Sequence, residues 1–185
     1  YWDRSAESTQ DKYMGNITNG ADLYDFEGYK IYRATDFEFN DAYNITDGDG
    51  NPTFLEPYVQ NGIRAQWDLV DGKSGWHPVD LNGIKFYLGD DTGLTHSYVD
   101  HNVVNGQRYY YAVVSYDYGG DLSNNIIPSD SPMKLRVNPL TGAVSLGPNV
   151  VEVVPSPPSA GFVDASFAGD QVDHVLGASS GEVFL

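Results

Sequence analysis

The chain has 185 residues, which is enough for one domain with extensions or for two small domains. Its 26 acidic side chains against 10 basic ones give a formal net charge of −16, a field that repels nucleic acid and anionic membrane surfaces. The absence of cysteine excludes disulfides and thiolate chemistry, and with no long apolar run we expect no membrane insertion.

The composition favours short strands joined by many turns. The chain contains 14 Tyr, 8 Phe and 3 Trp among 20 Gly and 10 Pro, and no stretch shows helical periodicity. We therefore predict an all-β protein in which the polar first 25 residues supply the first strands. Asn16 and Asn44 each begin a short sequence that fits the N-glycosylation acceptor pattern, which often matches by chance.

The first strong strand is predicted at residues 26–35. Tyr29 and Ile31 fall on one face, with Lys30 interleaved as on a half-buried strand. Residues 36–95 then form a long stretch rich in Asp-Gly and Asn-Gly turns, and the short apolar runs between these turns predict small additional strands. These runs are residues 54–55, 67–70 and 84–88.

The clearest pattern lies at residues 97–118. Residues 97–100 are predicted to form one strand, Asn105 and Gly106 a turn, and residues 109–116 a second strand that is apolar on both faces. A strand that buries both faces belongs in the middle of a sheet that packs against another sheet.

Three further segments complete the chain. Residues 133–137 alternate strictly and predict an edge strand guarded by two cations, with Met133, Leu135 and Val137 pointing inward. Residues 149–154 are a strand candidate, and the Pro-rich residues 155–158 form a stiff linker. Residues 161–185 are a tail of small residues with apolar clusters.

The pairing of GYKIYRATD with SYVDHNVVNGQRYYYAVVSYDYGG resembles the fibronectin type III family, especially modules of large secreted bacterial surface proteins. The resemblance covers residues 26–40 and 94–138 and implies that the first motif is the third strand and the second motif spans the fifth and sixth strands. It also implies that Tyr109 is a structural tyrosine corner, whose hydroxyl bonds back to nearby backbone, and that residues 133–137 form the last strand. A secreted, extracellular or cell-surface location follows from the resemblance.

The predicted architecture is a fibronectin type III or immunoglobulin-like antiparallel β-sandwich with a long insertion and an extended C-terminal arm. Its boundaries are residues 1–138 for the sandwich, with the insertion at about residues 41–95. Residues 139–160 form a strand and a Pro-rich linker, and residues 161–185 form the arm. The resemblance covers scaffold residues, so it implies a fold more strongly than a function.

Asp47, Asp49 and Asn51 alternate like the opening of a calcium loop, in which side-chain oxygens converge on one ion. An EF-hand needs Gly at Pro52 and Glu at Tyr58, so that particular loop is excluded. Two interpretations remain, a calcium site in a different oxygen cage and a solvated Asp-Gly turn.

We expect a non-enzymatic protein, because the sequence has no serine elbow, no phosphate-binding glycine loop and no zinc-protease helix motif. The first functional hypothesis is a structural, filament-forming subunit whose partners are copies of itself or neighbouring domains. Its subunit contacts would be made by the arm residues Phe162, Phe167, Val183 and Phe184. The alternative is a carbohydrate-binding module of a secreted glycosidase. In that case Trp67 and Trp76 stack on glycans, unless they form the insertion's own core.

Overall fold

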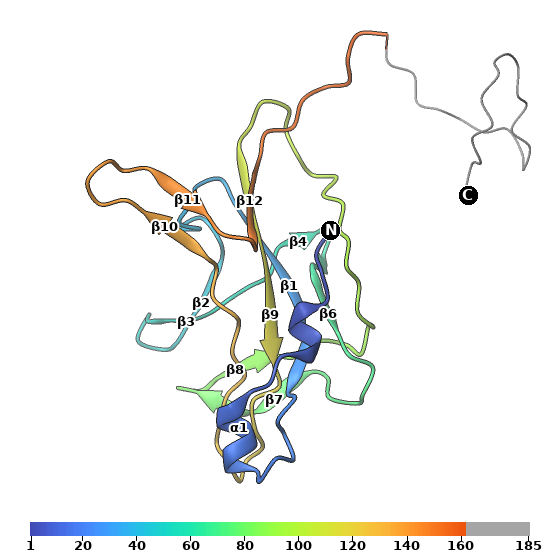
Figure 1. Ribbon diagram of the computed structural model, residues 1–185, viewed down its shortest axis with the longest axis vertical. Helices are drawn as coiled ribbons and strands as arrows, with labels where there is room; N and C mark the ends of the chain where they lie inside the picture. The colour runs from blue at the N-terminus through green and yellow to red at the C-terminus, as the bar shows by residue number, and fades with distance from the viewer. Residues whose placement is uncertain (162–185) are drawn as a thin grey trace, which may run out of the picture.

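The computed structural model describes residues 1–161 and shows antiparallel sheets with little helix (Figure 1). A 3-10 helix, η1 (Ser5–Ser8), and helix α1 (Lys12–Ile17) precede the first strand. The strands in chain order are β1 (Phe26–Ala34), β2 (Asn44–Thr46), β3 (Pro52–Leu55), β4 (Val59–Gln60), β5 (Ile63–Arg64), β6 (Gln66–Asp68), β7 (Trp76–Leu81), β8 (Ile84–Tyr87), β9 (Tyr109–Asp117), β10 (Leu135–Val137), β11 (Val144–Leu146) and β12 (Val150–Val153).

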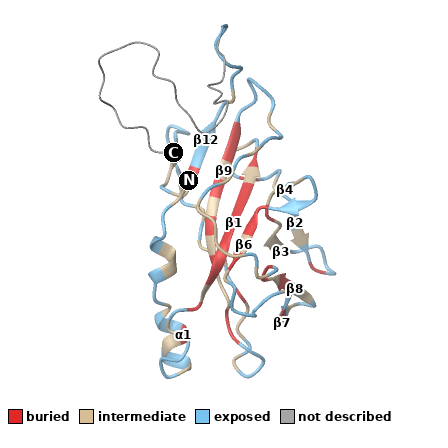
Figure 2. Ribbon diagram, turned by 90° about the vertical axis from the view of Figure 1, so that its right-hand side faces the viewer, coloured by how far each residue is buried: buried red, intermediate tan, exposed pale blue. Residues whose placement is uncertain are grey.

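The central sheet has the strand order β12–β9–β1–β6, with every neighbouring pair antiparallel. The long strands β1 and β9 pair from Phe26 opposite Asp117 to Ala34 opposite Tyr110, with a bulge between Phe26 and Gly28. Most of both strands is buried, as the red ribbons of Figure 2 show. The sequence prediction of a central strand at residues 109–116 is confirmed.

One face of this sheet is covered by three two-stranded hairpins. Tyr32, Val114 and their neighbours pack against Leu55 of the β2–β3 hairpin and Leu146 of the β10–β11 hairpin. Phe86 of the β7–β8 hairpin packs against Tyr116 of β9. The fold is therefore all-β, with one continuous sheet and a second layer made of separate hairpins.

The opposite face is covered by the N-terminal segment and by residues near position 98. The Trp2 ring lies 5.8 Å from the rings of both Tyr29 and Trp67, and the Tyr98 ring lies 5.6 Å from Trp67. This aromatic layer buries the second face of β1, which explains why that strand is not half-buried. On the other face of β1, Lys30 was predicted at a half-buried position, but it is only 3 % exposed because it packs on Phe86 of the β7–β8 hairpin.

The N-terminal segment differs from its prediction, because it contains helices rather than strands. Asp11 caps α1 by accepting hydrogen bonds from the backbone N–H groups of Tyr13 and Met14 at 2.7 and 3.0 Å. The helix has six residues and buries only Met14, so it is too short to show an apolar repeat in the sequence.

Two other predicted strands also need correction. Residues 97–100 are not a strand; they cross the face of the sheet, where the Asp100 side chain accepts hydrogen bonds from Arg33 and Tyr111. The strand β10 is present, but Val137 is 42 % exposed because β10 pairs with β11 in a hairpin outside the central sheet.

The sheet also extends beyond the predicted core of the module. The edge strand β12, after residue 138, pairs with β9, and β6, from the predicted insertion, pairs with β1. Within residues 1–161 no helix is long and apolar enough to cross a membrane.

Candidate functional site

A cavity of about 630 Å³ lies beside β6, the edge strand supplied by the predicted insertion. Its lining residues come from strands β4, β5, β6 and β8 and from the loop after β8. We call it the aromatic cavity. Its principal lining residues are Gln60, Arg64, Trp67, Tyr87, Asp90 and Tyr98.

The walls of the aromatic cavity are held in place by contacts between its own residues. The guanidinium carbon of Arg64 lies 4.8 Å from the centre of the Tyr87 ring, and Arg64 also forms an ion pair with Glu56. The Tyr87 hydroxyl donates to Asp90. That hydrogen bond, followed by burial, raises the pKa of Tyr87 to about 12.

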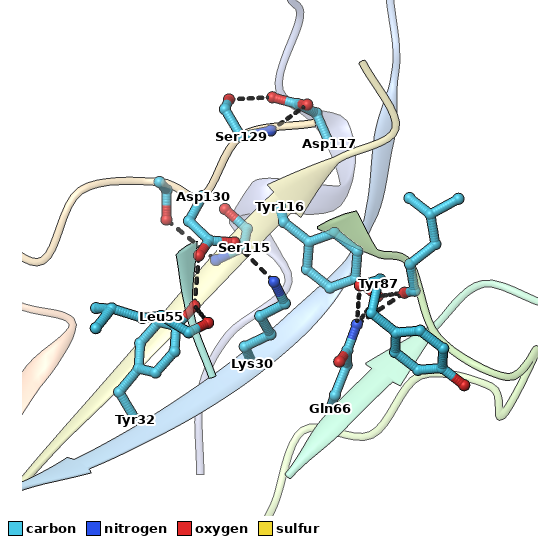
Figure 3. A network of polar contacts seen from close by, with 12 residues as sticks. Lys30, Tyr32, Leu55, Gln66, Tyr87, Ser115, Tyr116, Asp117, Ser129 and Asp130 are labelled. Carbon is cyan, nitrogen blue, oxygen red and sulfur yellow. Dashed lines mark hydrogen bonds and ion pairs between the residues drawn. The ribbon is translucent and has the colours of Figure 1, made fainter. Parts of the chain in front are cut away.

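The floor beneath Tyr87 is fixed by a buried amide. Gln66 Nε2 donates to the backbone oxygens of Leu88 at 2.8 Å and Tyr87 at 3.0 Å, and it lies 3.1 Å from the Tyr116 hydroxyl (Figure 3). The network ties β6 to β8 through side chain and backbone. The rings of Trp67 and Tyr87 are therefore preorganised on paired strands, while Tyr98 reaches the cavity from the loop after β8.

Rigid rings beside a guanidinium, an amide and a carboxylate suit a ligand with apolar C–H faces and a rim of hydroxyl groups. Aromatic rings bind the apolar face, and the charged and amide groups make directional hydrogen bonds with the rim. Of the two tryptophans predicted to contact glycans, Trp67 lines the cavity. Trp76 is 58 % exposed and packs on Tyr87, with the ring centres 5.0 Å apart.

The predicted calcium residues lie in the turn between β2 and β3. Asp47 Oδ1 accepts hydrogen bonds from the backbone N–H groups of Asp49 and Asn51 at 3.0 and 2.9 Å, and Asp47 Oδ2 faces the Asn82 amide at 3.3 Å. The hydrogen bonds from Asn51 hold the pKa of Asp47 below its usual range. The Asp47 carboxylate thus accepts hydrogen bonds from the backbone of its own turn, which is what a hydrogen-bonded Asp-Gly turn does. Calcium at this turn stays a prediction.

The Tyr109 hydroxyl accepts a hydrogen bond from the backbone N–H of Val104 at 3.0 Å, across the turn at Asn105 and Gly106. This is the kind of local backbone contact that a tyrosine corner makes. The predicted subunit-contact residues fall outside the described residues 1–161. They are Phe162, Phe167, Val183 and Phe184.

A charged pair between the buried Lys30 and the partly exposed Asp130 lies on the hairpin-covered face of the sheet, and the sequence did not predict it. Lys30 Nζ is 3.3 Å from Asp130 Oδ1 and 3.6 Å from the centre of the Phe86 ring, while the Tyr32 hydroxyl donates to Asp130 Oδ2 (Figure 3). Burial lowers the pKa of Lys30, and the charge of Asp130 opposes that shift. A cation at a core position of β1 was the available signal, but Asp130 lies too far along the chain to be recognised as its partner.

No protein-family model, curated protein or solved structure matches the chain.

Proposed function

We propose that this chain is a non-enzymatic, extracellular module of the fibronectin type III kind that binds carbohydrate in the aromatic cavity. The observation that carries the proposal is the convergence of Trp67, Tyr87 and Tyr98 with Arg64 and Asp90 around one cavity. A pyranose ring has the C–H faces and hydroxyl rim that such a lining recognises.

The strand order gives independent support to the proposed module type. In immunoglobulin-like sandwiches the third, sixth and seventh strands share one sheet. The resemblance assigns the third and sixth strands to β1 and β9, and these two strands are neighbours. The strand β12 lies beside β9, where a seventh strand belongs, and we therefore assign the last position of the proposed module to β12 instead of residues 133–137.

Replacing Trp67 with alanine is expected to weaken glycan binding about tenfold, because one ring–sugar stacking contact contributes about 1.5 kcal/mol. Binding is measured by calorimetry against the glycans selected on an array. The matched control is Tyr43→Ala, because Tyr43 is 73 % exposed and does not line the cavity. Since Trp67 also packs on Trp2, the melting temperature of each variant is recorded beside its affinity. No binding to any glycan by the folded wild-type chain would rule out this function.

A second candidate function, a structural subunit that polymerises through its C-terminal arm, is favoured by the open edge at β12. Among residues 1–161 this strand pairs with β9 alone, and Val151 and Val153 on it are 53 % and 39 % exposed. An exposed, apolar edge strand is a template for strand addition. The occupant that we propose is the segment of residues 161–185 from a second copy, which supplies Phe162, Phe167, Val183 and Phe184.

For this second function, Val151→Lys is expected to abolish concentration-dependent assembly, because a lysine on the edge blocks addition of an apolar strand. Truncation after Val154 is expected to have the same effect. Light scattering and electron microscopy measure the assembly, and Val70→Lys is the control, because Val70 is 73 % exposed at a site away from β12. If the truncated chain assembles as well as the full chain does, the arm is not the connector.

A further inference from the structure

Three carboxylates from distant parts of the sequence meet at one end of the central sheet. Asp11 caps helix α1, Asp25 lies one residue before β1, and Asp117 is the last residue of β9. One carboxylate oxygen from each lies within 4.8 Å of the other two, which no other group of acidic or histidine residues in positions 1–161 achieves. The helix α1 lies beside this end of the sheet in Figure 1.

The Asp25 carboxylate has no partner of its own that would explain its burial. Asp25 is 8 % exposed, and its Oδ2 atom is buried without a hydrogen-bond donor. Leaving a buried carboxylate oxygen without a donor is costly, so such a group normally faces a cation or takes up a proton. None of the ion pairs found among residues 1–161 includes Asp11, Asp25 or Asp117.

The other two carboxylates are oriented by hydrogen bonds and keep free acceptor capacity. Asp11 Oδ1 accepts from the backbone of Tyr13 and Met14, and the two oxygens of Asp117 accept from the N–H and hydroxyl of Ser129 at 2.8 and 2.5 Å. An ionised carboxylate has about four lone-pair positions, so these bonds fix each group without saturating it. Such a second layer of hydrogen bonds orients the carboxylates that bind metal ions.

We infer that Asp11, Asp25 and Asp117 bind a divalent cation, calcium by its ligand chemistry. Oxygens that bind one calcium ion lie at most about 4.8 Å apart, twice a bond of about 2.4 Å, and the three carboxylate oxygens of this group all lie within that limit. The three residues also line a cavity of about 530 Å³, which has room for the waters that complete a calcium shell.

A bound cation would reduce the electrostatic repulsion among the three carboxylates. Three carboxylates this close together repel one another when they are ionised, and the buried Oδ2 atom of Asp25 has no donor that would offset the repulsion. A divalent ion removes this repulsion and links α1 to the ends of both long strands. The proposed ion thus clamps the N-terminal segment onto the sheet, independently of glycan binding or assembly.

The test is thermal unfolding of the full chain, first freed of metal with a chelator and then titrated with calcium at constant ionic strength. We expect the melting temperature to rise with the logarithm of the calcium concentration once the ion is in excess of its dissociation constant. The variant Asp25→Asn should lose this rise. In chelator it should melt no lower than the wild-type chain, because the substitution removes a repulsive charge, and this shows that it folds.

The matched control is Asp80→Asn, an exposed carboxylate of β7 outside both acidic sites, which should retain the full response to calcium. Asp117→Asn provides a second variant, and terbium luminescence gives a direct readout of occupancy in each chain. The proposal is overturned if calcium does no more than sodium at equal ionic strength. It is also overturned if Asp47→Asn loses the response and Asp25→Asn keeps it, because the ion then binds at the turn.

Discussion

Replacing Gly28 with alanine is expected to destabilise the fold by about 3 kcal/mol, the upper part of the range for forcing an extra methyl group into a packed interior. A Cβ atom on Gly28 would lie 2.2 Å from the backbone oxygen of Trp67 and 2.8 Å from the Tyr116 hydroxyl. The first contact is with backbone of the paired strand β6, which cannot rotate away as a side chain can. Strand β6 would have to move relative to β1, against the pairing of Tyr29 with Trp67.

Urea unfolding measures this loss, and Gly48→Ala is the matched control. Gly48 lies in the β2–β3 turn, and a Cβ atom there has no other atom within 4 Å and no unusual backbone angle to oppose it. The control should change the free energy of unfolding by less than about 0.5 kcal/mol, as open surface positions do. Because β6 carries Trp67, the Gly28 variant should also bind glycan more weakly. Equal stability of the two variants would contradict the close approach of β1 and β6.

The sequence was sufficient to predict the long strands and insufficient to predict what covers them. In β9 the run from Tyr109 is apolar at nearly every position, and in the structure one face of the strand is buried while the other is half-buried. In β1 the burial of both faces was hidden, because Lys30 and Arg33 interrupt the apolar pattern and each has a partner far along the chain. Periodicity reports the average polarity of a face, so it cannot show that a charge is paired in the interior.

From the sequence, only Trp67 and Trp76 could be named as candidate residues of the aromatic cavity. Trp67 lines the cavity, and its contact with glycan stays a prediction. The cavity also needs Tyr87 and Tyr98, which come from a different hairpin and loop. The carboxylates at the end of the sheet were missed for a similar reason. The acidic spacing at Asp47 resembles a calcium loop along the chain, whereas Asp25 and Asp117 meet only because β1 and β9 pair. Spacing along the chain can identify a site within one loop. A site whose ligands come from different strands can be identified only when the pairing register of those strands is known.

Replacing Asp130 with asparagine is expected to destabilise the protein by about 3 kcal/mol at neutral pH, because it leaves the buried Lys30 ammonium without a counter-charge. Lys30 is 3 % exposed, and beyond Asp130 its ammonium faces the rings of Phe86 and Tyr116, 3.6 and 4.8 Å from their centres. Rings of this kind stabilise a cation by less than a carboxylate does. The amide also cannot accept fully from both Lys30 and Tyr32, which share the carboxylate in the wild-type chain.

The pH dependence of the Asp130→Asn variant has a defined sign. Burial already lowers the pKa of Lys30, and loss of the opposing charge of Asp130 lowers it further. Between that lowered pKa and the ordinary value near 10.5, the unfolded chain binds the proton and the folded chain does not, so stability rises with pH. The wild-type chain gains in the same way only above its own, less lowered Lys30 pKa, so the deficit of the variant should shrink between the two folded-state pKa values, both of which lie below 10.5.

Adding Lys30→Met to Asp130→Asn should recover much of the lost stability. The double variant removes the uncompensated charge and leaves an apolar side chain of similar length against Phe86 and Tyr116. Urea unfolding of the wild-type chain, both single variants and the double variant completes a thermodynamic cycle, from which the coupling between the two residues is obtained. A double variant that is less stable than Asp130→Asn alone would mean that Lys30 is held by its ring contacts, and that Asp130 serves Tyr32 instead.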